Sequence, residues 1–261
     1  MQYKLGKRPA IKGYGLRLLD YMPSLPPLPS GDFGHQYCVT NWQMLGNGPD
    51  PSNPPAIPNG VGDCAIAGPY HAEMLWNAVA GKSINVNTTT VVNTYSEVTG
   101  YVLGDDSTDR GSNVDQVSNY WHNTGLVDAD GNLHKIDAWA NLTPGNMKEL
   151  LYAIYLFDVV GIGVQFPNEW MVALNEGQVW DAISNPSVEG GHYILGVGSV
   201  GGNIDVITWG QEQRLTPAGY RQFCDEAVVY VSRERLLASG KDLNGFDIDQ
   251  LMADFAALPK L

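Results

Sequence analysis

The sequence predicts an α+β fold, in which a helical N-terminal part packs against an antiparallel sheet or barrel formed by the C-terminal part. Apolar residues recur at three- and four-residue spacing in the first half of the 261-residue chain, whereas strand-like apolar runs separated by turns dominate the second half. No internal repeat is visible. In such an arrangement, a site is expected in the cleft between the helical part and the sheet part.

Helices are expected at four places in the first 160 residues. The apolar spacing over residues 63–80 predicts a helix with one buried stripe, and Pro69 predicts a kink or a distorted opening. Residues 90–101 and 113–123 are weaker candidates. Over residues 143–156, a Thr-Pro pair has the form of an N-cap followed by proline at the first helical position.

Five strand-like runs are expected: His134–Leu142, Val159–Val164, His192–Val200, Ile204–Trp209 and Ala227–Val231. The glycine-rich stretch 196–201 matches a dinucleotide-binding pattern in its letters, but another strand follows it instead of a helix, so we expect a hairpin. Near the end of the chain, residues 248–258 are expected to form a helix whose apolar face docks on the body.

Three segments are expected along the chain. Residues 1–58 form an arm and loop rich in proline and glycine, which we expect to be mostly extended, with a surface loop over residues 46–60. Residues 59–232 form the main domain, and residues 233–261 form a C-terminal helical tail. The arm is a candidate for self-association or for assembly into a larger particle.

Composition excludes several classes of function. The net charge of −13 argues against a general affinity for nucleic acid or for anionic membranes. No signal-peptide pattern or apolar run long enough to span a bilayer is visible, so we expect a protein without a membrane partner. The five histidines are scattered singly, without zinc spacing, and we expect no metal and no cofactor.

The three cysteines, Cys38, Cys64 and Cys224, are too few and too far apart to indicate a disulfide scaffold, so a reducing compartment such as the cytoplasm is expected. Cys64 differs from the other two because the stretch Gly62-Asp63-Cys64-Ala65-Ile66-Ala67-Gly68 predicts a tight turn leading into a helix. A helix N-terminus favours thiolate over thiol, so we expect the pKa of Cys64 to be lowered.

Far downstream, His192 opens a strand-like run after two glycines, so a cysteine is followed by a histidine along the chain. This order resembles that of the papain-like cysteine peptidases, and the resemblance extends from about Asn59 to Val231. It is carried by Gly62-Asp63-Cys64, by Gly191-His192-Tyr193 and by the run ending in Thr208-Trp209-Gly210. It implies a cleft in which Cys64 and His192 meet as an ion pair, shielded from water by Trp209.

More narrowly, Leu5-Gly6-Lys7, Met44-Leu45-Gly46-Asn47 and Gly62-Asp63-Cys64 with His71 resemble uncharacterised papain-like proteins of bacteriophages and bacteria. This likeness implies a virion-associated location as an alternative to the cytoplasm. His71 lies on the same helical face as Cys64, but seven residues correspond to about 10 Å along a helix, too far for proton transfer, so we interpret it as a packing residue.

Two positions depart from the peptidase pattern. Ile207 stands where the family has the asparagine that orients the histidine ring. Thr208 is the nearest polar residue, but on a regular strand it points to the opposite face from Ile207 and Trp209. Asp205 would share the face of Ile207. The sequence therefore predicts a Cys-His dyad whose third member is missing or replaced.

The second departure concerns the side chain that stabilises the oxyanion, for which the family uses a glutamine six residues before the cysteine. Pro58 occupies that position and has no side-chain donor. Asn59 and Asn47 both remain candidates, the latter if the proline-rich loop between them folds outward.

The resemblance implies a thiol hydrolase, most simply a peptidase that takes a peptide or protein substrate. A cell-wall amidase or a transglutaminase-like enzyme would share the dyad and differ only in its pocket. The alternative from another class is a catalytically inactive papain-like scaffold that decorates a phage particle, which Ile207 and the long arm favour.

Overall fold

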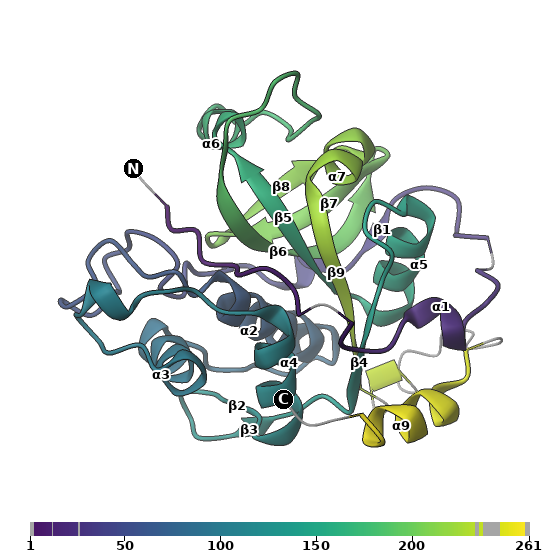
Figure 1. The fold of residues 1–261 in the computed structure, drawn as a ribbon, viewed down its shortest axis with the longest axis horizontal. Helices are drawn as coiled ribbons and strands as arrows, with labels where there is room; N and C mark the ends of the chain where they lie inside the picture. Colours follow the sequence, from purple (N-terminus) through teal and green to yellow (C-terminus); the bar gives the residue numbers. More distant parts are fainter. Residues whose placement is uncertain (1–2, 12, 26, 233–234, 237–245, 259–261) are drawn as a thin grey trace.

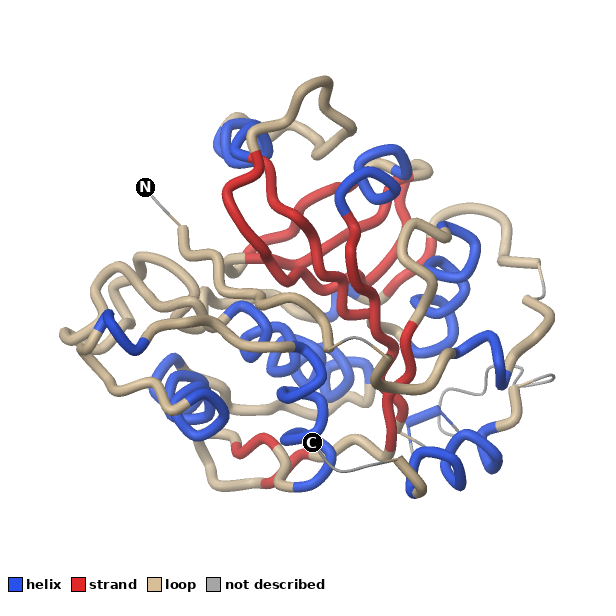
Figure 2. Tube along the Cα trace, in the orientation of Figure 1, coloured by secondary structure: helices blue, strands red, loops and turns tan. Residues whose placement is uncertain are grey.

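The computed structural model describes residues 3–11, 13–25, 27–232, 235–236 and 246–258. Helices α2 (Cys64–Val79), α3 (Thr88–Thr99) and α4 (Val114–Asn123) lie together on one side, with the hairpin of β2 (Leu126–Val127) and β3 (Leu133–His134) beside them. The large sheet lies on the other side (Figures 1 and 2). The predicted α+β organisation is confirmed.

The large sheet is antiparallel. Its strands follow the order β4 (Ala138–Asn141), β9 (Cys224–Val231), β5 (Val160–Pro167), β6 (Val188–Val200), β7 (Asn203–Thr208) and β8 (Gln211–Leu215), and β1 (Phe33–Gly34) pairs with β6. Across the described residues, this path is open and does not close into a barrel. The predicted hairpin of residues 196–201 is confirmed as the turn between β6 and β7.

Helix α2 is buried along nearly its whole length. We expected one buried stripe, but every residue from Cys64 to Asn77 is buried, because α2 packs against β6 on one side and against α3 and α4 on others. The helix continues through Pro69 without a break. Gly68 allows the ring of Tyr193 on β6 to approach the helix backbone, since a Cβ at that position would overlap the ring.

Several predicted boundaries need correction. The helix α5 (Met147–Phe157) begins after Asn146, whose side chain accepts a hydrogen bond from the N–H of Glu149, and not after Thr143. The predicted strand 134–142 is interrupted, and only Ala138–Asn141 pairs with β9. In the predicted surface loop 46–60, Gly46, Asn47 and Gly48 are buried.

Among the described residues, the periodicity did not indicate three helices, α1 (Leu18–Tyr21), α6 (Asn168–Asn175) and α7 (Pro217–Phe223), whereas it predicted α9 (Ile248–Ala256). The predicted docking of the last of these is confirmed, because Leu251 and Phe255 are buried and the Phe255 ring lies 4.4 Å from that of Trp139. Residues 233–234, 237–245 and 259–261 of the predicted tail lie outside the described residues.

Candidate active site

Cys64 is the first residue of α2, and only 3% of its surface is exposed. Burial raises the pKa of its thiol to about 12, although the backbone N–H groups of Tyr193 and Gly6 face the sulfur and oppose that rise. The prediction of a lowered pKa is therefore wrong for this covered site, because removing the sulfur from water outweighs the positive end of the helix dipole.

His192 lies on β6 and is fully buried. Its Nε2 atom is 2.7 Å from Oγ1 of Thr208, and its ring stacks on that of Trp209 with centroids 4.2 Å apart and planes 14° apart. Burial lowers the pKa of His192 to about 3, so the ring is neutral near neutral pH. The expected ion pair between a thiolate and an imidazolium is therefore absent from this covered form.

Thr208 lies on the face opposite Ile207, as predicted, and from there it contacts Nε2 of His192, where an orienting side chain is expected. The pairing of Leu195 with Ile207 places Ile207 on the face of Leu195, and Thr208 consequently lies on the opposite face, which His192 shares. Trp209 follows the end of β7 with a positive φ of 47°, and this break in the alternation brings its ring back over His192. Regular strand alternation accounts for the side on which Thr208 lies, but it does not account for Trp209.

Asp205, the other candidate orienting group, is engaged elsewhere. Its carboxylate accepts a hydrogen bond of 2.7 Å from Gln36 and pairs with Arg214 at 3.2 Å.

Cys64 and His192 are linked in the structure through the residues that contact the His192 ring. Thr208 and Trp209, which hold the His192 ring, also line a cavity of about 10 Å³ together with Cys64. A cavity of this size holds at most one water molecule. Within the described part of the chain, Nδ1 of His192 has no hydrogen-bond partner, so it forms no hydrogen bond with the thiol.

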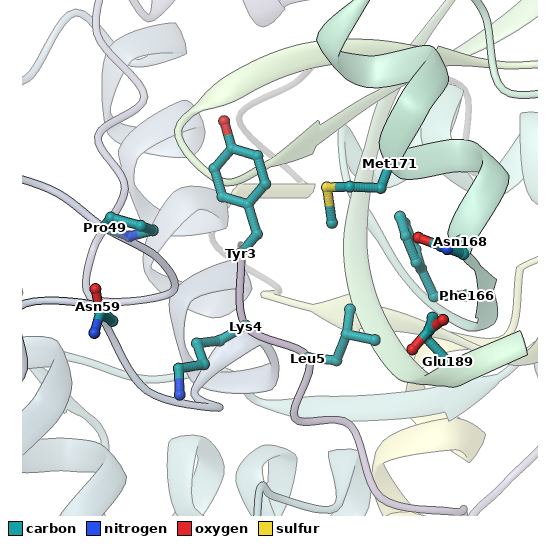
Figure 3. A pocket seen from close by; sticks show the side chains of 9 residues that line it. All are labelled: Tyr3, Lys4, Leu5, Pro49, Asn59, Phe166, Asn168, Met171 and Glu189. Atoms are coloured by element: carbon teal, nitrogen blue, oxygen red, sulfur yellow. The ribbon is translucent and has the colours of Figure 1, made fainter. Parts of the chain in front are cut away.

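The two candidate oxyanion residues are separated. Asn47 is buried, lines the same cavity as Cys64 and donates from Nδ2 to the carbonyl oxygen of Val61 at 3.1 Å. Asn59 is exposed and lines a larger cavity of about 850 Å³, together with Tyr3 and Pro49 (Figure 3).

His71 also lines the small cavity. Its Nε2 atom is 3.0 Å from the carbonyl oxygen of Gln43, and burial lowers its pKa to about 4. These contacts agree with the interpretation of His71 as a packing residue.

Residues 3–8, which we call the N-terminal segment, run between the helical part and the sheet (Figure 1). On the sheet side, Lys7 donates its N–H to the carbonyl oxygen of Gly191 at 3.0 Å. On the helical side, Ser112 donates to the carbonyl oxygen of Gly6 and accepts from the N–H of Arg8, both at 2.8 Å. The segment therefore bonds to both walls of the cleft through its main chain.

Glycines allow this close passage. A Cβ on Gly6 would overlap the carbonyl group of Gly62, two residues before Cys64, and a Cβ on Gly111 would overlap the carbonyl of Gly6. At the entrance, the ring of Tyr3 stacks on Trp209 with centroids 4.7 Å apart. These contacts could not be predicted from periodicity, because a six-residue extended segment is too short for its pattern to indicate which residues it contacts.

No protein-family model matches the sequence, and the search of curated proteins found no match. Solved structures are similar. Xylellain, a cysteine protease from Xylella fastidiosa, superposes with a TM-score of 0.62 at 12% identity over 89% of this chain and 98% of its own. The chain has the fold of the papain-like cysteine proteases.

Two further structures share this fold. The cysteine protease CMS1MS2 of Carica candamarcensis, in complex with E-64, gives a TM-score of 0.57 at 15% identity over 78% of this chain and 99% of its own. Digestive procathepsin L 3 from the larval midgut of Tenebrio molitor gives 0.60 at 14% identity, over 86% of this chain and 76% of its own.

Among the residues that the structure describes, no group of three or more His, Cys, Asp or Glu side chains could hold a metal ion. In the same part of the chain, none of the helices combines the length and the apolar character that crossing a membrane requires.

Proposed function

We propose that this protein is a papain-like thiol hydrolase that cleaves peptide or amide bonds, with Cys64 as the nucleophile and His192 as the proton carrier. The observation that carries the proposal is the position of Cys64 at the start of α2, where its sulfur faces the backbone N–H of the residue after His192. The likeness to cysteine proteases in fold supports it.

In the proposed reaction, the thiol proton moves to Nδ1 of His192 while Sγ of Cys64 attacks the carbonyl carbon of the substrate. Nδ1 is free to accept this proton because Thr208 holds the other ring nitrogen. The proton then passes to the leaving amine, and a water molecule hydrolyses the thioester that remains.

Two N–H donors are placed to stabilise the oxyanion. The backbone N–H of Cys64 is at the start of α2, where such groups lack a partner within the helix. The amide of Asn47 has two hydrogens; it donates to the carbonyl oxygen of Val61 and also interacts with the buried carboxyl group of Asp63, which an oxyanion would have to replace as a partner. The geometry favours Asn47 over Asn59, which lines a different cavity.

The N-terminal segment has to leave the cleft before a substrate can enter. The carbonyl oxygen of Gly6 accepts a hydrogen bond from Ser112, on the helical side, so this carbonyl group is held by the wall of the cleft. Displacement admits water, which moves the pKa of the Cys64 thiol down and that of His192 up, toward the range in which a proton can pass between them.

Gly6→Ala tests the proposal, because the added methyl group cannot fit against Gly62 and should expel the segment. We expect iodoacetamide to alkylate Cys64 roughly tenfold faster than in the original chain, with Cys38 and Cys224 as internal references whose rates do not change. We also expect hydrolysis of a denatured protein substrate, lost on adding Cys64→Ala.

Gly190→Ala is the matched control. A Cβ at that position makes only an ordinary contact of 3.5 Å with Leu5, so the segment stays and Cys64 remains slow to react. A Gly6→Ala chain whose Cys64 reacts rapidly, yet which hydrolyses no peptide or amide, would contradict the proposed function.

The buried, neutral state of Cys64 and His192 favours a second candidate, a papain-like scaffold with a structural role, for example in a phage particle. This candidate predicts assembly into large complexes in light scattering, with Cys64→Ala and the original chain assembling equally well. A monomeric particle that becomes an active hydrolase on Gly6→Ala would exclude it.

A further inference from the structure

The side chain of Lys7 fills an acidic pocket beside the covered thiol. This side chain is 1% exposed, and its Nζ atom lies 3.0 Å from Oδ1 of Asp225 and 3.4 Å from Oε2 of Glu226. Burying an ammonium group is costly unless opposite charges surround it, so the two carboxylates make this position suited to a cation.

The acidic pocket consists of Gly163 on β5, Asp225 and Glu226 on β9, and Asp115 on α4. The methylene groups of Lys7 pass over Gly163, where a Cβ would overlap them. Among the described residues, Oδ1 of Asp115 has no hydrogen-bond partner, and Oε2 of Glu226 has only the ion pair with Lys7. The pocket thus has three carboxyl groups, and Lys7 forms close ion pairs with two of them, Asp225 and Glu226.

The main chain at Lys7 is held without any use of the side chain. Lys7 donates to Gly191, and its two neighbours bond to Ser112 on the opposite wall. Because Gly6 packs against the carbonyl group of Gly62, two residues before Cys64, the residue in the acidic pocket is adjacent to the one that covers the turn leading to the thiol. Any extended peptide that follows the main chain of residues 6–8 would place one side chain in the pocket, next to the peptide residue that lies beside Cys64.

We propose that the acidic pocket selects a lysine or arginine side chain in the peptide substrates of this protein, and that Lys7 occupies it in their place. The inference rests on the proposed function and names the substrate class of the same site. An apolar side chain would leave the buried carboxyl group of Glu226 without a cation, which is unfavourable, and would also remove the partner of the more exposed Asp225.

The test separates binding from cleavage. In the full chain carrying Gly6→Ala and Cys64→Ala, the probe is a synthetic peptide of residues 3–10, and its partner has norleucine in place of Lys7. We expect the lysine peptide to bind about tenfold or more tightly in calorimetry, because hydrogen bonds to charged groups contribute that much. Glu226→Gln and Asp225→Asn should each reduce this preference, whereas Asp106→Asn, at an exposed position, should not.

A second arm uses the Gly6→Ala chain with Cys64 intact and a mixture of peptides that are varied on both sides of a central bond, with the products read by mass spectrometry. We expect cleavage within two residues of a lysine or arginine. Lysine-selective binding without cleavage would support the pocket and contradict the hydrolase. Cleavage without a basic preference, or equal binding of the two probes, would overturn the pocket and leave the hydrolase standing.

If Gly6→Ala fails to fold or keeps its segment, Lys7→Ala empties the pocket directly. We then expect n-butylammonium, which has the shape and charge of a lysine side chain, to raise the melting temperature of Lys7→Ala but not that of the original chain. Neutral n-butanol should have no such effect. An equal response to both compounds would overturn the proposal.

Discussion

Thr208 forms the side-chain hydrogen bond that positions the ring of His192, the proposed proton carrier. Its hydroxyl group replaces the amide that the papain-like pattern would supply from position 207, where Ile207 stands. A hydroxyl can donate to or accept from Nε2 of His192, whereas an asparagine side-chain oxygen can only accept. Thr208 therefore restricts the ring position while leaving both neutral tautomers open to it.

Replacing Thr208 by valine should leave Nε2 of His192 buried and unpaired. We expect a loss of about 1 to 3 kcal/mol in the free energy of unfolding, and we expect kcat/KM of the Gly6→Ala chain to fall roughly tenfold because the ring is less well oriented. Thr208→Ser keeps the hydroxyl and should retain most activity. An unchanged kcat/KM in the valine variant would show that Thr208 does not position the ring.

Glu226 predicts a pH dependence of stability. Burial raises its pKa from 4.5 to about 7, against the lowering effect of Lys7, and Asp115 and Asp225 raise it further. Glu226 therefore binds its proton more tightly in the folded state than in the unfolded state, and this difference stabilises the fold. The stabilisation is complete below pH 4.5 and is lost as the pH rises through about 7. The change is at most about 3 to 4 kcal/mol, since one pKa unit corresponds to about 1.4 kcal/mol.

Glu226→Gln should remove this part of the pH dependence. Urea unfolding at several pH values between 4 and 8 would measure it. A variant whose unfolding free energy still falls by the same amount over that range would show that another group carries the proton.

At the scale of elements, α2 and β6 pack so closely that a single methyl group matters. Gly68→Ala would ordinarily stabilise a helix by about 1 kcal/mol. Here we expect a loss of about 1 to 3 kcal/mol instead, because the new Cβ overlaps the buried Tyr193 ring, which is held by a hydrogen bond of 2.9 Å to Tyr230. Thermal unfolding measures this loss.

A double-mutant cycle provides the control for this prediction. In a Tyr193→Ala background the overlap is gone, and Gly68→Ala should no longer destabilise. Simple additivity of the two changes would indicate that the ring does not limit the approach of α2 to the sheet.

The elements that could be predicted from the sequence are those with strong apolar patterns. The strands β5, β6, β7 and β9 and the helix α2 were found within a few residues of their bounds, apart from the first residues of β6 and β9. β8 was missed because its sequence, Gln211–Leu215, is mostly polar and is held by its pairing with β7. Tertiary pairing of this kind leaves no periodic signal in the strand itself.

The candidate site was predicted in part for the same reason. Motifs around Cys64 and His192 placed both at one cleft, whereas the covering of the thiol by Gly6 depends on contacts between residues far apart in the sequence. The covering in turn decides the pKa of the thiol, so a local argument from the helix N-terminus gave the wrong direction.

On the scale of the whole molecule, the N-terminal segment connects the two sides of the cleft. Its main chain bonds to Ser112 beside α4 and to Gly191 on β6, and the Lys7 side chain reaches β9. The segment therefore contributes to the stability of the arrangement as well as covering the site. Removing the segment should weaken the hydrogen bonds that cross the cleft more than those within the helical part or within the sheet.

Hydrogen exchange would reveal this order of opening. In Gly6→Ala, we expect the amides of Lys7, Arg8 and Ser112 to exchange much faster than in the original chain, because their acceptors lie across the cleft. Amides within the β5 and β9 pairing should keep their protection, since those bonds do not involve the segment. Gly190→Ala should leave all of these rates unchanged. Uniform acceleration throughout the sheet would instead mean that Gly6→Ala destabilises the whole fold, and that the segment cannot leave the cleft while the sheet remains folded.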